Sequence, residues 1–403
     1  MPSEIPIGER PVVAAYCSTF LSADMRHIYR QVVGLKTFQA HVITRKRQNE
    51  TEFPRHHKWV TVLPKPRHRF LRRLYYQSFK GVPWPMNDSE VRDFLYAIQR
   101  HDAKVLHIYF GNIAVQLLPV LKTIRWPVVV SFHGADAGAD LENPAHLSLM
   151  QEVFQHSTLV LARSESLLDR LRSAGCPEGK LRLQRTSIPI FKVEFRERTL
   201  PPAGGAWRIF QACRLVEKKG LPTSLQVFKN ILAEHPNSRF RIAGSGPMEE
   251  SLKRQCKELG ISANVDFLGF LDQDQILEEA YASHLFLHPS QMGTDLNQEG
   301  VPNAMLEAMA TGLPAIATRH GGIPEAVTHR ESGMLSDEKD VADLTNNTLA
   351  LMSDPELYQE VSRGARKAIE EKFELRRQLN QLESHYNEAI NLHAEIERTS
   401  PQT

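Results

Sequence analysis

The sequence predicts an α/β protein built from two doubly wound domains. Short β-rich runs alternate with helical patterns in each half of the chain, and a stretch without periodicity separates the halves. The length agrees with two domains, because 403 residues exceed what one ordinary hydrophobic core accommodates.

The alternation predicts parallel strands joined by helical crossovers. The strands of the first half are expected at residues 12–16, 40–44, 105–110, 127–132 and 159–163. Those of the second half are expected at 208–212, 240–243, 265–268, 285–288 and 315–318, with helices at 223–234 and 247–259. The Pro- and Gly-containing stretch 200–206 is typical of a linker.

These patterns predict an N-terminal Rossmann-like domain over residues 1–199 and a C-terminal one over 200–374. A polar, charged helical pattern from residue 375 onward is expected to pack back on the N-terminal domain. Because ligands of doubly wound sheets bind beyond the carboxyl ends of the strands, we expect a site in a cleft where two such sheets face each other.

The composition excludes several classes of protein. Basic and acidic side chains nearly balance, 49 against 47, so no global field demands a nucleic acid partner. The four cysteines lie far apart and have no zinc-binding or disulfide pattern. No run reaches the roughly 18 apolar residues of a membrane span, and the N-terminus is unlike a signal peptide. We expect a cytoplasmic protein, with any membrane contact peripheral on the inner face.

The strongest motif covers residues 298–314. Glu299 and Glu307 lie eight positions apart, Pro302 stands where a first helical turn accepts proline, and Gly312 stands where a helix ends. Glu299 is therefore expected in a loop and Glu307 within the following helix. The free N–H groups at the start of that helix would suit a diphosphate. Two solvated glutamates, or the paired acids of a glycosidase, are alternative interpretations of this spacing.

Together with residues 315–325, which include Gly321 and Gly322, this string resembles the signature of retaining GT-B glycosyltransferases of family 4, also called group 1. The resemblance is close over residues 207–335 and is nearest to members that act in bacterial surface polysaccharides. It implies two Rossmann-like domains and a nucleotide-diphosphate sugar as donor.

The resemblance also assigns roles to individual residues. It implies that Glu299 contacts hydroxyls of the donor sugar and that Glu307 holds the ribose hydroxyls. It implies that Arg214 and Lys219 bind the donor diphosphate. Further contacts to the nucleotide sugar are expected from two turns and from the start of the motif helix. These residues are Gly244, Gly246, Phe267, Gly269, Phe270, Gly300, Val301, Pro302 and Asn303. For Gly244 and Gly246, a tight turn without ligand contact is an equally good interpretation.

In the first domain, His133 matches a family histidine that approaches the donor sugar, and Asp136 would orient it or touch the acceptor. The chain departs from many family members after its first strand, where Cys17 to Ser22 replace a glycine pair. A subgroup of surface-polysaccharide enzymes shares this departure and the landmarks at 107–111 and 133–136.

No metal or other cofactor is expected. Residues 272–274 spell a DxD motif, but Asp272 directly precedes a helical pattern, where an aspartate is a good N-cap. The sequence thus predicts a retaining, metal-independent glycosyltransferase that moves a sugar from a UDP- or GDP-linked donor to a glycan or lipid-linked acceptor. A nucleotide-sugar epimerase of similar architecture and a non-catalytic sugar-nucleotide-binding protein are the alternatives.

A local excess of positive charge marks the stretch between Phe53 and Asn87, which contains no acidic residue. Basic and aromatic side chains alternate there, with four arginines close together: Arg67, Arg69, Arg72 and Arg73. This pattern predicts either a solvated basic helix or a surface for anionic lipid or a lipid-linked acceptor.

Overall fold

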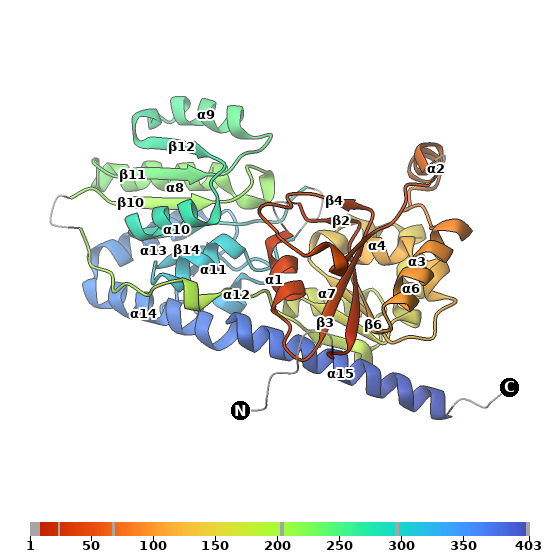
Figure 1. The fold of residues 1–403 in the computed structure, drawn as a ribbon. Helices are drawn as coiled ribbons and strands as arrows, with labels where there is room; N and C mark the ends of the chain where they lie inside the picture. The colour runs from red at the N-terminus through yellow and green to blue at the C-terminus, as the bar shows by residue number, and fades with distance from the viewer. Residues whose placement is uncertain (1–8, 23–24, 67–68, 202–204, 295–297, 400–403) are drawn as a thin grey trace. The chain divides into compact units, whose positions relative to one another are not determined.

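The computed structural model describes residues 9–22, 25–66, 69–201, 205–294 and 298–399 (Figure 1). The chain divides into two compact units, Met1–Ser187 with Arg376–Thr403, and Ile188–Leu375. The boundary falls before the expected residue 200 because Ile188 and Val193 already pack in a core of the second unit. Each unit is an α/β layer structure of its own.

The first unit contains a parallel sheet of seven strands. In spatial order they are β5 (Val60–Val62), β3 (Gln39–Thr44), β1 (Val12–Tyr16), β6 (Ala103–Tyr109), β7 (Val128–Phe132), β8 (Leu159–Ala162) and β9 (Leu181–Leu183). Strand β1 lies between β3 and β6, with Val13 opposite Ala40 and Val105. A separate two-stranded pair joins β2 (Thr19–Phe20) to β4 (Lys46–Arg47).

Helices cover this sheet because its strands are apolar on both faces, as in Val128–Phe132, which is buried throughout. The helices are α1 (Arg26–Gly34), α2 (Arg69–Tyr75), α3 (Asp88–Arg100), α4 (Gly111–Gln116), α5 (Leu118–Leu121), α6 (Pro144–His156) and α7 (Glu165–Ser173). A π-helix, η3 (Tyr76–Lys80), continues α2. Figure 1 shows α2 at the periphery of the unit, beyond α3 and α6.

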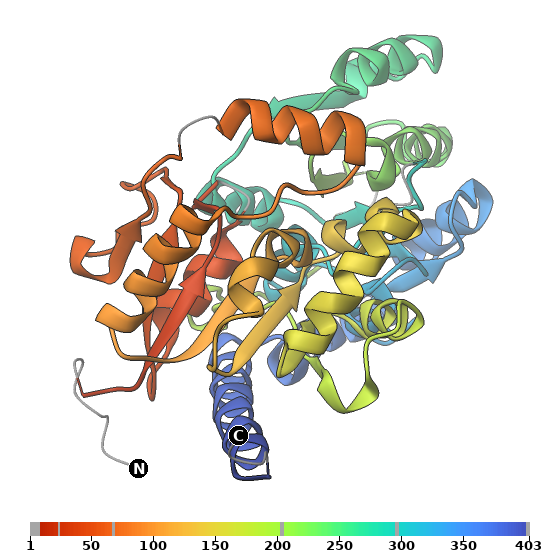
Figure 2. The ribbon, with the colours of Figure 1, turned by 90° about the vertical axis from the view of Figure 1, so that its right-hand side faces the viewer.

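The long helix α15 (Leu375–Thr399) completes the first unit and is seen nearly end-on in Figure 2. Its Glu383 carboxylate accepts hydrogen bonds from the backbone N–H groups of Lys36, Thr37 and Phe38. Leu379, Leu382 and Tyr386 form its buried stripe, at the spacing that an amphipathic helix requires. No described helix of the chain is both long and apolar enough to cross a membrane.

The second unit contains a parallel sheet of six strands. In spatial order they are β12 (Val265–Gly269), β11 (Arg239–Ala243), β10 (Arg208–Ala212), β13 (Leu285–His288), β14 (Ala315–Thr318) and β15 (Met334–Ser336). The helices are α8 (Leu221–Glu234), α9 (Glu249–Glu258), α10 (Gln273–Ala282), α11 (Asn303–Ala310), α12 (Ile323–Ala326), α13 (Val341–Ser353) and α14 (Pro355–Lys372).

Alternate residues of these strands belong to different cores. Ile209 and Leu285 pack in one cluster, whereas Phe210 and Phe286 pack in the other. Both faces of the sheet are therefore covered, as a doubly wound fold requires. The order of strands reverses between β10 and β13 here, and between β1 and β6 in the first unit.

Candidate active site

The loops that follow β10 and β13 meet at the point where the strand order of the second unit reverses. In a doubly wound sheet this point forms the natural crevice for a ligand. Lys219 ends the short 3-10 helix η8 (Glu217–Lys219) after β10, and Glu299 lies in the loop after β13. Their side chains form an ion pair, and each is only 11% exposed. Two residues that the sequence singled out separately are thus in direct contact.

A second ammonium group lies beside this pair. Lys218 Nζ is 4.0 Å from a Glu299 carboxylate oxygen. Burial alone would raise the pKa of Glu299, but the charges of Lys219 and Lys218 outweigh it and lower the pKa to about 2. The carboxylate therefore stays ionised. Two ammonium groups against one carboxylate leave an excess of positive charge, which suits an anionic ligand.

The same loop leads into helix α11, which begins at Asn303 with Pro302 as its N-cap. Pro302 makes no side-chain cap hydrogen bond, so the first N–H groups of the helix are not capped from the side chain before them. Val301 anchors the entry to the helix because its side chain is buried in the core. Gly300 precedes it. The helix start thus offers its positive dipole end beside the loop that carries Glu299.

Glu307 lies one turn further along α11 and is buried. Its Oε1 accepts a hydrogen bond from the side-chain amide of Gln273 at 2.9 Å. Gln273 is the first residue of α10, and Asp272 before it is the N-cap in a capping box with Gln275. The prediction that Asp272 caps a helix is therefore confirmed. Sequence reasoning missed Gln273, and its place in the DxD motif was the available signal.

The glycine turn after β11 is pressed against the segment after β10. A Cβ on Gly244 would lie 1.8 Å from the Cys213 carbonyl oxygen, and φ there is +129°. A Cβ on Gly246 would lie 2.5 Å from the Leu215 carbonyl oxygen. These close approaches explain both glycines by packing. Whether the turn also contacts a ligand stays a prediction.

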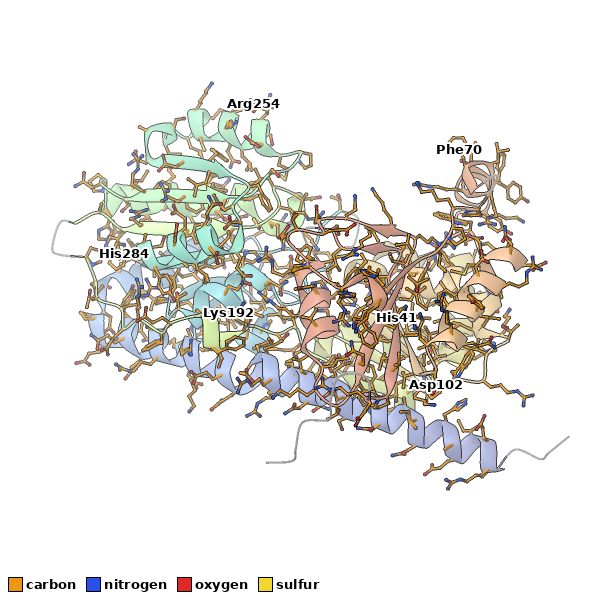
Figure 3. All side chains as sticks on the ribbon, in the orientation of Figure 1. His41, Phe70, Asp102, Lys192, Arg254 and His284 are labelled. Atoms are coloured by element: carbon orange, nitrogen blue, oxygen red, sulfur yellow. The ribbon has the colours of Figure 1, made fainter. Side chains whose placement is uncertain are left out.

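The residues from Phe267 to Phe270 do not all line the same site. The Gly269 carbonyl accepts the Gly244 N–H at 2.7 Å, which ties the turns after β12 and β11 together. Phe270 follows and is 68% exposed. The Phe267 ring instead lines a cavity of about 610 Å³ between α9 and β12, beside Lys253 and Arg254. Figure 3 shows Arg254 on α9, at the β12 edge of the sheet.

Arg214 also follows β10, but it is exposed, and within the described part of the chain no ion pair joins it to another side chain. Lys219 is the buried cation of this segment. The joint diphosphate role of Arg214 and Lys219 stays a prediction from the family resemblance.

In the first unit, His133 follows β7 and takes part in a row of side-chain hydrogen bonds. Its Nδ1 lies 3.1 Å from His27 Nε2 and 3.5 Å from the Arg163 guanidinium, and its Nε2 lies 3.2 Å from Ser131 Oγ. Because an arginine can only donate, Nδ1 accepts and Nε2 carries the proton. Burial, His27 and Arg163 hold the pKa of His133 well below its usual range.

The row continues into the interior. Ser131 Oγ lies 2.9 Å from His107 Nε2, and His107 Nδ1 lies 2.7 Å from the hydroxyl of Tyr386 on α15. Burial lowers the pKa of His107 to about 3, so this imidazole is neutral as well. The sequence pointed to His107 as a landmark but gave no signal for Ser131 or Tyr386 as its partners.

Asp136 organises the turn that carries His133. One carboxylate oxygen accepts the N–H groups of His133 and Gly134 at 2.8 and 3.0 Å, and the other accepts the Gly111 N–H at 2.8 Å. Burial raises the pKa of Asp136, although these three hydrogen bonds oppose the rise. These hydrogen bonds agree with the expectation that Asp136 orients the turn of His133. Contact of Asp136 with the acceptor stays a prediction.

The structure describes the side chains of only two of the four clustered arginines of the first unit. Arg67 and the side chain of Arg69 lie outside the described part of the structure. Arg72 forms an ion pair with Glu90, and the Arg73 guanidinium lies 5.6 Å from the centre of the Trp84 ring. The segment also exposes five large apolar or aromatic side chains beside the exposed Arg73 and Lys80: Phe70, Leu71, Leu74, Tyr75 and Phe79.

Among the described residues, no group of three or more His, Cys, Asp or Glu side chains is arranged to hold a metal ion. Metal independence stays a prediction.

Two family models together span most of the chain. Residues 193–368 match the model described as glycosyl transferases group 1, and residues 26–189 match the model described as glycosyltransferase family 4. The chain belongs to the group 1 glycosyltransferases.

Several curated relatives are named for polysaccharide biosynthesis. The colanic acid biosynthesis glycosyltransferase WcaL of Salmonella typhimurium is 30% identical over 59% of this chain and 58% of its own length. WcaL of Escherichia coli K12 is 29% identical over 68% of this chain and 67% of its own length. The amylovoran biosynthesis glycosyltransferase AmsK of Erwinia amylovora is 30% identical over 68% of this chain and 66% of its own length. The matched stretch thus spans about three fifths to two thirds of these relatives.

Solved structures show the same fold. Anabaena HepE in complex with UDP and glucose superposes with a TM-score of 0.75 at 17% identity, over 94% of this chain and 99% of HepE. The sucrose-phosphate synthase of Thermosynechococcus elongatus gives 0.71 at 16% identity, over 94% and 99%. The predicted GT-B class, with its two Rossmann-like sheets, is confirmed.

Proposed function

We propose that the chain transfers a sugar from a UDP- or GDP-linked donor to a glycan or lipid-linked acceptor in surface polysaccharide or glycolipid biosynthesis. The observation that carries the proposal is the buried Lys219–Glu299 pair, which lies at the strand-order reversal of the second unit and in the loop that leads into α11. The named functions of WcaL and AmsK and the UDP bound by HepE support it.

In the proposed reaction, the bond between the anomeric carbon and the diphosphate oxygen breaks, and a bond from that carbon to an acceptor hydroxyl oxygen forms. The hydroxyl proton passes to the departing nucleoside diphosphate. Lys219 and the N–H groups at the start of α11 stabilise the charge that develops on the leaving group. The family resemblance adds Arg214 to this task and predicts that the anomeric configuration is retained by attack from the same face.

Glu299 and Glu307 divide recognition of the donor between them. Carboxylate oxygens accept hydrogen bonds from neighbouring hydroxyls, which suits Glu299 for the sugar and Glu307 for the ribose. The resemblance adds His133 of the first unit as a further contact to the sugar.

The first test is thermal melting of the protein against UDP, GDP, ADP and CDP. A ligand at about 100 times its dissociation constant adds about 2.7 kcal/mol of stability, which is readily measured. We expect UDP or GDP to stabilise the protein. Stabilisation by none of them would contradict the proposal.

The second test separates transfer from the alternatives and addresses the metal. We expect transfer from the matching nucleotide sugar to continue in EDTA, because cationic side chains replace the metal at the leaving group. Loss of activity in EDTA with recovery in Mg²⁺ or Mn²⁺ would contradict metal independence. Epimerised nucleotide sugar formed without any acceptor would identify an epimerase instead.

We further propose that the segment of α2 and η3 contacts an anionic lipid surface. Phe70 and Phe79 are 73% and 77% exposed, and Figure 3 shows Phe70 on the peripheral helix α2. Apolar side chains beside a segment without acidic residues fit the boundary of a negatively charged bilayer. Because Arg72 is paired with Glu90, we expect the lipid contact to come chiefly from the exposed apolar side chains.

The test is co-sedimentation with vesicles of phosphatidylglycerol or of phosphatidylcholine alone. We expect binding to the anionic vesicles to fall in a Phe70→Ser, Phe79→Ser double variant and to persist in Tyr96→Ser, which removes an exposed aromatic residue elsewhere in the first unit. Equal binding of all three proteins would overturn the lipid contact.

A further inference from the structure

A single carboxylate, Glu338, holds both ends of the loop that carries Glu299. Glu338 follows β15, and its Oε2 accepts the backbone N–H of Met292 at 2.8 Å. Its Oε1 lies 2.6 Å from His320 Nδ1. The first contact fixes the start of the loop, and the second acts on its end through the histidine.

His320 follows β14, and its side chain is only 1% exposed. Its Nε2 lies 3.0 Å from the backbone nitrogen of Glu299. A backbone N–H can only donate, so Nε2 accepts and the imidazole proton lies on Nδ1, which faces Glu338. The carboxylate thereby fixes the tautomer that the Glu299 N–H requires.

The turn after His320 supports Glu299 on its carbonyl side. A Cβ on Gly321 would lie 1.9 Å from the Glu299 carbonyl oxygen, and φ at Gly321 is +55°. The Gly322 N–H donates to the Gly300 carbonyl at 3.2 Å. The backbone of Glu299 is therefore held on both sides, while its carboxylate is held by Lys219.

We propose that Glu338 and His320 are positioning residues that set Glu299 for the sugar of the donor. The proposal rests on the proposed function, in which Glu299 binds the sugar and Glu307 the ribose. Strands β13, β14 and β15 are neighbours in the sheet, so their loops reach one another at its carboxyl edge. Glu307, by contrast, accepts a hydrogen bond from Gln273 on α10.

The arrangement makes a specific prediction for Glu338→Gln. Met292 and His320 donate to different carboxylate oxygens, so in this geometry the NH₂ group of an amide would face one of the two donors. Loss of one hydrogen bond to a charged group weakens a site by about tenfold or more. The loss is expected only for ligands that contain the sugar, since the nucleotide contacts stay in place.

The experiment is calorimetric titration of the full chain with UDP, UDP-glucose, GDP and GDP-mannose. For the pair that the wild type binds, Glu338→Gln should weaken the nucleotide sugar about tenfold and leave the nucleoside diphosphate unchanged. Asp337→Asn is the matched control, because this neighbouring acid is 79% exposed and pairs only with Arg319 among the described residues. Equal losses for both ligands, or no loss, would overturn the positioning role.

A second pair of variants keeps the test informative if Glu338→Gln folds poorly. His320→Gln retains an oxygen that can accept the Glu299 N–H, whereas His320→Asn retains only the shorter donor toward Glu338. The proposal predicts that the glutamine variant binds the nucleotide sugar more tightly than the asparagine variant. The reverse order would contradict it. A wild type that binds none of the four ligands would instead refute the proposed function itself.

Discussion

Polar clusters lie at the carboxyl ends of central strands in both units, but their charge differs. In the second unit, Lys219 and Glu299 are ionised and nearly buried, and Lys218 adds a second positive charge. In the first unit, His133 and His107 are neutral, and their nitrogens are joined through Ser131. The central strands follow a similar order in both units, so the residues of the loops decide which charges line each cluster.

The largest effect is expected from the charged cluster. Lys219→Ala should lower transfer about 10²-fold or more, because a lost contact to a developing anion costs about 2.7–4 kcal/mol. Lys218→Ala is the matched control and should be mild, since its ammonium lies at 4.0 Å from Glu299 rather than in direct contact. Steady-state transfer rates measure both. Equal rates for the two variants would show that the buried lysine has no special role.

Glu307→Ala should have the next largest effect, on the affinity for the nucleoside diphosphate. Loss of hydrogen bonds to a charged acceptor corresponds to about 1.5–3 kcal/mol, or roughly ten- to a hundredfold. Gln273→Ala, which removes only the amide that holds Glu307, should weaken the same affinity less. Titration of each variant with UDP or GDP measures this affinity. Unchanged affinity in Glu307→Ala would overturn the assignment of Glu307 to the ribose.

The neutral cluster predicts a pH effect on stability. The pKa of His107 is about 3 in the folded protein and about 6.5 in the unfolded chain, so the unfolded state binds more protons between these values. Its contribution is complete above pH 6.5 and is lost below it, by up to about 1.4 kcal/mol per pH unit. The lowered pKa of Glu299 acts only at more acidic pH, below about 4.3.

Denaturant unfolding of wild type and His107→Gln at pH 7, 6 and 5 measures this effect. The variant should lose part of the slope of stability against pH, whereas replacement of the exposed His156 by glutamine should not change the slope in this way. Identical slopes in all three proteins would contradict the buried, neutral state of His107.

The smallest effect is expected from Ser131→Ala, which removes the hydroxyl between His133 and His107. A neutral hydrogen bond contributes about 0.5–1.5 kcal/mol, so transfer should fall a few-fold with no change in nucleotide affinity. Ser157→Ala is the control, since its buried hydroxyl donates to Val153 away from this row. A loss of nucleotide affinity in Ser131→Ala would mean that the two clusters do not act separately.

Much of this fold could be predicted from the sequence. The bounds of β1, β10, β13 and β14 agree with the β-rich runs because these buried strands are apolar on both faces. Strands β5, β9 and β15 were missed, because three residues at or near the edge of a sheet carry too little periodicity.

The candidate site was predicted less completely. Glu299 and Lys219 were each identified by resemblance, but their contact depends on β10 lying beside β13, which no local pattern reveals. His320 and Glu338 act through the backbone of another residue, and such contacts leave no chemical motif in the chain. The side-chain hydrogen bonds of His133 with His27 and Arg163 were not foreseen either, because these residues lie far from it in the sequence.

The central claim is that the charged cluster of the second unit is the donor site. A crystal structure with the nucleoside diphosphate that stabilises the protein tests it most directly. We predict the diphosphate against Lys219 and the first N–H groups of α11, with the ribose hydroxyls on Glu307. A nucleotide bound elsewhere, for example in the cavity between α9 and β12, with Lys219 still paired to Glu299, would contradict the claim.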